Sequence, residues 1–215
     1  MGDFRIRAAA LTLVACALLP KAAAAEEIVP RSYAAAPING NLLVLGYSTS
    51  WGAVLTDESL PVTNVNASID RTPLGYAHTF ALGKKTANIQ AILPYNAGNF
   101  SGDVGGSART TSRWGYGDLV VRLGWNLIGD PALTPAQFAH RHATTTFGTS
   151  LTVLAPTGAY NPQLLINASS HRWAFVPEAG FEAPLHNWFL DGSAGAWLFT
   201  DNANFFGGHV RSQNP

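Results

Sequence analysis

The sequence is poor in charged residues. Lys, Arg, Asp and Glu together make up 12% of its 215 residues, about half the usual share in a soluble domain. Apolar residues reach an ordinary 47%, and 21 glycines together with small polar residues take the place of the missing charge. The 13 basic and 13 acidic side chains cancel. No basic patch or block of like charge indicates a nucleic-acid partner or a charged tail.

Cysteine is almost absent, because Cys16 is the single one. The chain therefore has no internal disulfide framework and no thiolate metal site. Residues 1–25 have the layout of a cleaved secretory signal peptide: Arg5 and Arg7, an apolar run over 8–20, then small residues before Glu26. Cleavage there removes Cys16 and leaves a net charge of about −2.

The four residues ending at Cys16, Leu-Val-Ala-Cys, allow another interpretation. They resemble the lipid-attachment box of bacterial lipoproteins, in which this cysteine would be lipidated. The apolar stretch continues past Cys16, which favours the later cleavage.

Long apolar runs are missing after residue 25, which excludes a helical membrane protein. Catalytic patterns are missing too. No Gly-x-Ser-x-Gly elbow occurs, and Glu178 and Glu182 are ~13 Å apart along a strand, beyond the roughly 5–9.5 Å of a glycosidase pair. The pair His140 and His142 has no nearby third ligand except Asp130, so a solvated turn is the default. We expect no enzymatic activity, no metal and no cofactor.

What the sequence does have is alternation. In 118–127, Leu119, Val121, Leu123 and Trp125 fall on one face of a strand. Arg122 falls on the other face, where Val120 is the only apolar residue. Comparable segments cover 41–50, 64–82, 87–95, 145–155, 172–183 and 188–199. Most have the length that a tilted strand needs to cross a bilayer, and several begin or end with Trp or Tyr. Within 64–82 the alternation changes phase, which predicts a bulge or break near Pro73.

These features predict an all-β fold, an antiparallel up-and-down transmembrane β-barrel. Residues 26–40 would be a periplasmic lead-in and 41–215 the amino-terminal part of the barrel. Short periplasmic turns are expected at 83–86 and 184–187. Long outer loops are expected at 51–63, 96–115, 156–171 and after 200. The stretch 128–144 is too long for a turn, and Thr134 followed by Pro135 predicts a short helix there.

The two strand faces then receive different roles. The polar face would line a lumen, and its candidate residues are Asn88, Gln90, Asp118, Arg122, Asn126, Arg172, Glu178, Glu182 and Asp191. The apolar face would meet lipid, with Leu119, Val121, Leu123, Trp125, Phe147, Leu151, Trp173 and Phe175. Arg122 and Asp118 form the best candidate pair, either a salt bridge that sets the barrel's shape or a constriction charge.

Several motifs also resemble those of a known family. These are Pro156-Thr157-Gly158-Ala159-Tyr160, then Leu165-Ile166-Asn167, Arg172-Trp173-Ala174-Phe175-Val176-Pro177, Trp188-Phe189-Leu190-Asp191, Gly115-Tyr116-Gly117-Asp118-Leu119 and Leu93-Pro94. They resemble the outer-membrane family associated with the meta-pathway of phenol degradation, over roughly residues 40–205. The resemblance implies an outer-membrane barrel that is transporter-like, a channel for small aromatic or other apolar compounds. It brings no catalytic motif.

Family members continue beyond the equivalent of Asn202 with further strands, and seven strands is an odd number for a bacterial barrel. We therefore expect the sequence to be a fragment or a truncated reading frame. An open edge in lipid leaves unpaired backbone groups. A heat-modifiable folded band is thus expected only when the missing strands are present.

The leading hypothesis is a passive channel in the bacterial outer membrane, with lipid and a small apolar or aromatic ligand as partners and no nucleic acid. Its oligomeric state stays open. A secreted, soluble β-sandwich that binds a ligand is the first alternative, because a sandwich strand also has one apolar face. A structural or adhesive barrel that acts through its loops is the second.

Overall fold

The computed structural model describes residues 31–54 and 62–212. The expected signal peptide over 1–25, the alternative lipidation site at Cys16 and residues 26–30 of the expected lead-in lie outside the described residues. Arg31–Pro215 form one compact unit. In the described part, no helix is long and apolar enough to cross a membrane.

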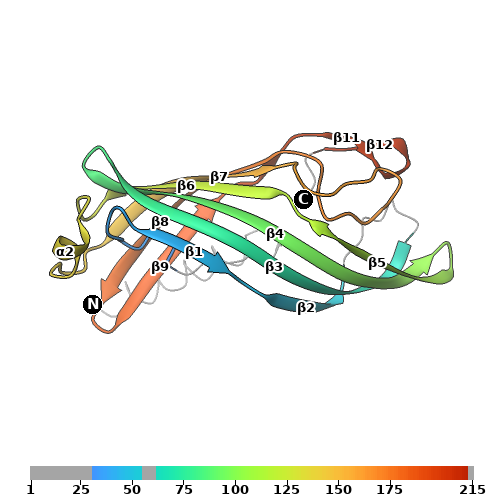
Figure 1. Ribbon diagram of the computed structural model, residues 1–215, viewed down its shortest axis with the longest axis horizontal. Coiled ribbons are helices and arrows are strands. Elements are labelled where there is room, and N and C mark those ends of the chain that lie inside the picture. Colours follow the sequence, from blue (N-terminus) through green and yellow to red (C-terminus); the bar gives the residue numbers. More distant parts are fainter. Residues whose placement is uncertain (1–30, 55–61, 213–215) are drawn as a thin grey trace, which may run out of the picture. The chain divides into compact units, whose positions relative to one another are not determined.

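One antiparallel sheet dominates the unit (Figure 1). Its strands are β1 (Asn41–Leu45), β2 (Ser48–Ala53), β3 (Val62–Leu82), β4 (Lys85–Val104), β5 (Ser107–Tyr116), β6 (Leu119–Ile128), β7 (Thr146–Ala155), β8 (Ala174–Leu185), β9 (Trp188–Gly195) and β10 (Leu198–Phe199). The order across the sheet is β1-β3-β4-β6-β7-β8-β10. Both β1 and β2 pair with β3, both β5 and β6 pair with β4, and both β9 and β10 pair with β8. The expected strand segments therefore reappear in sequence order.

The expected connections are partly confirmed. The turns after β3 and β8 are tight, with Gly83 and His186 at positive φ. Between β6 and β7, Pro135–Phe138 form the short helix α2. Thr134 caps it as expected, and Gln137 completes a capping box by accepting from the Thr134 backbone N–H. After residue 200, β11 (Asn202–Phe205) and β12 (His209–Arg211) form a small hairpin around the 3-10 turn Phe206–Gly208.

The prediction of a long loop over 96–115 is wrong. Strand β4 continues to Val104 and returns as β5, with unbroken pairing from Tyr95↔Tyr116 to Val104↔Ser107. Gly105 and Gly106, with φ of 57° and 80°, make the turn. The side chains of this hairpin are mostly small and polar on both faces, so the sequence shows no alternation there and looks like a loop.

The break expected near Pro73 is present on one side of β3 only: the neighbouring strand is interrupted between Leu45 of β1 and Ser48 of β2, opposite Pro73. Pairing between β3 and β4 runs without interruption through Thr72↔Tyr95, Pro73↔Pro94 and Leu74↔Leu93, and the irregularity lies between Thr63 and Asn66. The apolar residues change face while the strand continues. Those near the start of β3 are buried on one side, and those after Pro73 are exposed on the other. A change of phase therefore marks a change of environment along one strand.

Candidate functional site

Pairing gathers polar residues from five strands on one face of the sheet. In successive rows across β4, β6, β7, β8 and β9, Gln90 lies opposite Arg122, Ser150 opposite Glu178, and Glu182 opposite Asp191. Asn88 and Asn126 share this face by the same register. Seven of the nine residues expected to line a lumen thus belong to one surface, which we call the polar face. That this face borders a lumen stays a prediction.

The charges at the centre of the polar face come from Arg122 and Glu178. Arg122 Nη2 lies 3.8 Å from Glu178 Oε1. This nitrogen is buried and has no hydrogen-bond partner among the described residues. Ser193 donates to the other carboxylate oxygen of Glu178 at 3.1 Å. The Arg122 guanidinium and the Glu178 carboxylate thus lie side by side, and Arg122 Nη2 is a donor without a hydrogen-bond acceptor among the described residues.

The expected pair of Arg122 with Asp118 is wrong. The Asp118 carboxylate accepts hydrogen bonds from Gly158 N at 3.1 Å, Ser169 Oγ at 2.5 Å, and the backbone and side chain of Ser170, both at 2.9 Å. Asp118 therefore fastens the connection between β7 and β8. Four residues along a strand are ~13 Å apart, so Arg122 finds its acidic partner across the strands instead.

Arg172 also lies apart from the central charges. It is buried, its Nη1 donates to the carbonyl of Ser212 at 2.5 Å, and its guanidinium stacks 4.0 Å from the ring centre of Phe199. These contacts join the residues just before β8 to β10 and to the residue that follows β12.

A segment that the sequence did not single out covers the polar face. Tyr33, in the expected lead-in, is only 4% exposed. Its hydroxyl donates to Glu178 Oε1 at 2.6 Å and lies 3.1 Å from Ser150 Oγ. Burial, and then the bond to Glu178, raise the pKa of the Tyr33 phenol, so this hydroxyl keeps its proton.

Arg31 holds the same segment at a second point. Its Nε and Nη2 donate to the two carboxylate oxygens of Glu182 at 3.1 and 3.2 Å. This bidentate geometry with a carboxylate favours arginine. Its guanidinium also lies 4.3 Å from the ring centre of Phe189. We call residues 31–33 the strap. The sequence of 26–40 shows no alternation of apolar and polar residues, so it does not predict where the strap lies. The contacts of the strap with Glu178 and Glu182 show its position.

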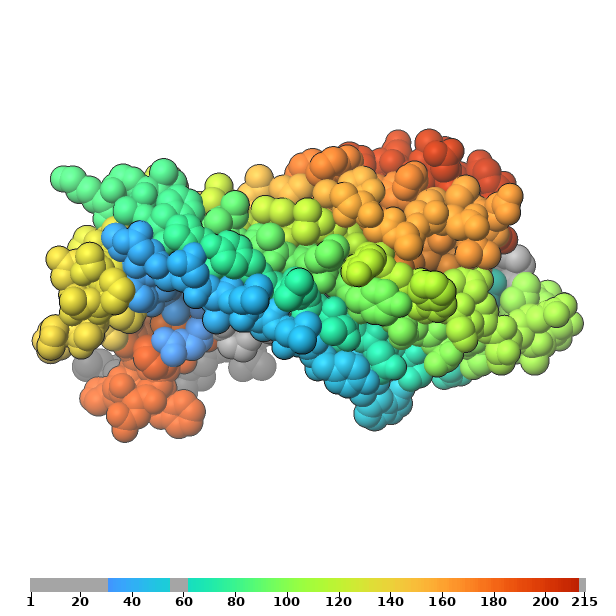
Figure 2. All heavy atoms as spheres, in the orientation of Figure 1, coloured from blue at the N-terminus to red at the C-terminus, as the bar shows by residue number. Residues whose placement is uncertain are grey.

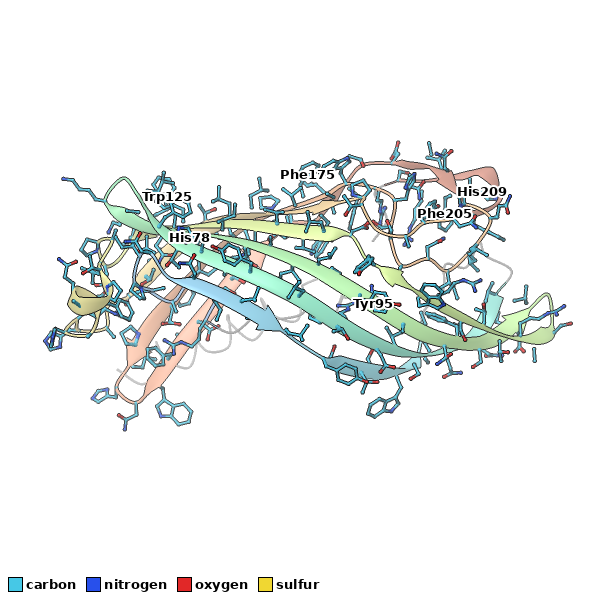
Figure 3. All side chains as sticks on the ribbon, in the orientation of Figure 1. His78, Tyr95, Trp125, Phe175, Phe205 and His209 are labelled. Atoms are coloured by element: carbon cyan, nitrogen blue, oxygen red, sulfur yellow. The ribbon has the colours of Figure 1, made fainter. Side chains whose placement is uncertain are left out.

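The opposite face of the sheet is apolar and uncovered. Leu123 and Phe147 are each 46% exposed, and pairing of Leu123 with Leu151 and of Val153 with Phe175 places the expected apolar row on this one side. Trp125 and Phe175 project away from the ribbon (Figure 3). In the view of Figure 2, no other described element lies in front of strands β1 to β4. Among residues 31–54 and 62–212, the other sheet is the two-stranded β11–β12, which is too small to form the second layer of a sandwich.

The histidines of the β6–β7 connection gain no carboxylate ligand. Arg141 binds Asp130 at 2.8 Å, and Thr144 donates to the other oxygen of that carboxylate. Within the described ranges, no group of three or more His, Cys, Asp or Glu side chains has the spacing of a metal site.

Comparison with known proteins supplies a family and a fold. The family model described as "Putative MetA-pathway of phenol degradation" matches residues 56–213. The crystal structure of an outer membrane channel from Pseudomonas putida F1 matches with a TM-score of 0.64 and 22% identity, over 87% of this chain and 67% of that chain. No curated protein matches the sequence. The expected fold class is confirmed: the sheet is a curled, incomplete antiparallel β-barrel.

Proposed function

The chain belongs to the family described as "Putative MetA-pathway of phenol degradation", and on that premise we propose that it is an outer-membrane channel for small aromatic or apolar compounds. Export through the amino-terminal signal peptide would deliver it to the bacterial outer membrane. Lipid is its partner on the outside, and the diffusing compound is its partner inside.

The observation that carries the proposal is the distribution of polarity. Large apolar side chains such as Leu123, Phe147 and Leu151 are exposed on one face, whereas Asn126, Ser150 and Glu182 are buried on the other. A water-soluble protein buries its large apolar residues and rarely leaves a continuous apolar surface open. A membrane barrel has the reverse arrangement, with apolar residues toward lipid and polar residues toward an aqueous lumen.

The polar face supplies what a selective passage needs. Rings of charged side chains set which solutes pass through a pore, and here Arg122 lies beside Glu178 whereas Arg31 pairs with Glu182. The proposed passage is passive.

Arg122→Ala in the full-length protein tests this assignment. We expect the free energy of unfolding to change by no more than about 1 kcal/mol, since partly exposed ion pairs contribute little. Conductance should instead become more cation-selective, because the acidic side chains beside position 122 lose their balancing charge. The reversal potential of single channels in a planar bilayer under a salt gradient measures this shift.

The matched control is Arg109→Ala, which removes the same charge from the exposed β4–β5 hairpin and should leave the reversal potential unchanged. Equal shifts from both variants would contradict the assignment of the polar face. Recovery of the unaltered protein in the periplasmic fraction without detergent would favour the soluble alternative.

A further inference from the structure

The side chain of Tyr33 is itself a phenol, and the polar face holds it as a receptor would hold a small ligand. The strap reaches this position from outside the sheet, so no strand geometry requires an aromatic ring there. The contacts of the Tyr33 ring and of its hydroxyl therefore indicate which contacts a free phenol could make at this position.

Two glycines open the space for the ring. Gly148 on β7 and Gly180 on β8 lie opposite each other. A Cβ at Gly148 would come within 2.6 Å of Tyr33 Cδ1, and a Cβ at Gly180 would meet the other edge of the ring. Arg122 lies above the ring at 5.4 Å from its centre, within the range of a cation–π contact. We call this space the cradle: the two glycines make room for both edges of the ring, and Arg122 lies over its face.

Three polar side chains close the end of the cradle. The Tyr33 hydroxyl donates to Glu178 and lies beside Ser150 Oγ. Arg122 Nη2, the buried donor without a hydrogen-bond partner among the described residues, points to the same carboxylate oxygen. A ligand at this end therefore meets an anionic acceptor, a hydroxyl and a spare cationic donor.

We propose that this cradle is a phenol-binding subsite, which Tyr33 occupies until a phenolic solute displaces it. The proposal rests on the proposed function, since it names the solute class of the same passage. Binding would release the strap and expose the polar face, so the solute would open its own path.

The Glu178 carboxylate at the end of the cradle favours phenols over other small aromatic compounds. Toluene offers no donor to Glu178, and a site built around a hydroxyl discriminates strongly against an analogue that lacks it. Benzoate would bring a second negative charge beside that carboxylate. A neutral phenol fits both the acceptor and the glycine-lined walls.

Tyr33→Ala tests the subsite. A tethered competitor acts at an effective concentration of about millimolar, so its removal should strengthen binding of 4-methylphenol, the free form of the tyrosine side chain, at least tenfold. Ligand-observed NMR on the full-length protein in detergent measures the affinity. Toluene should bind this variant at least tenfold more weakly than 4-methylphenol, and adding Glu178→Gln should remove most of that difference. An unchanged affinity for 4-methylphenol, or an equal affinity for toluene, overturns the proposal.

A second measurement needs no substitution. The bond after Arg31 is a trypsin site that the contacts with Glu182 and Phe189 hold against the sheet. In the unaltered protein, 4-methylphenol should accelerate cleavage there at least severalfold, and toluene at the same concentration should not. No acceleration by 4-methylphenol overturns displacement of the strap. Channels that conduct ions without any preference for 4-methylphenol would refute the subsite alone, whereas binding without any conductance would refute the channel.

Discussion

Replacing Leu123 with arginine should destabilise the membrane-inserted protein by ~2–4 kcal/mol, the cost of a cation on the lipid face at the bilayer midplane. Leu123 lies in the middle of β6, 46% exposed on the apolar face, with Ile89 and Leu151 as its neighbours across the sheet. Neither of these cross-strand neighbours offers a counter-ion. Equilibrium unfolding in lipid vesicles measures the difference.

Leu82→Arg is the matched control. Leu82 is exposed to a similar degree, 42%, on the same apolar face, but it lies at the last position of β3 beside the turn at Gly83. A cation near the interface costs only about 0–1 kcal/mol because its side chain reaches the headgroups. Equal losses at positions 82 and 123 would show that the apolar face does not cross a membrane.

The strands were predictable because apolar and polar residues alternate along a strand whose two faces lie in different environments. Every segment from 41–50 to 188–199 falls on observed strands, and the register brings seven of the nine expected polar residues onto one face. The short helix at Pro135 was predictable for a local reason, the capping chemistry of Thr134. Both signals lie within a few residues of sequence.

The features that the sequence did not predict depend on residues that are far apart in the sequence or on strands without alternation. Asp118 binds residues forty or more positions away, and Tyr33 binds Glu178 145 positions away. Neither contact leaves a period in the sequence. The β4–β5 hairpin was missed because its two faces are similar in polarity, so alternation has nothing to record. Side-chain contacts between residues far apart in the sequence determine the first two, and strand pairing determines the third.

Asp118→Ala should release the connection between β7 and β8, at a cost of about 3 kcal/mol. Hydrogen bonds to a charged group contribute roughly 1.5–3 kcal/mol each, and the Asp118 carboxylate accepts four. Their loss is not additive, since the freed donors of Ser169 and Ser170 can reach water once the connection opens. Backbone amide exchange at Gly158 and Ser170 should accelerate about a hundredfold, the equivalent of some 3 kcal/mol.

The comparison variant is Asp103→Ala. Asp103 lies near the end of the exposed β4–β5 hairpin and accepts from Asn64 Nδ2 at 2.8 Å, so its removal should leave exchange at Gly158 and Ser170 unaltered. Asp118→Asn should fall between the two, because the amide keeps one acceptor oxygen but turns a donor toward other donors.

Conductance separates the two roles first considered for Asp118. A structural clasp predicts larger open-channel fluctuations with the selectivity retained, whereas a constriction charge predicts a shifted reversal potential. The shift should therefore appear in Arg122→Ala and be absent from Asp118→Asn, since the carboxylate at 118 faces the β7–β8 connection and not the central charges of the polar face.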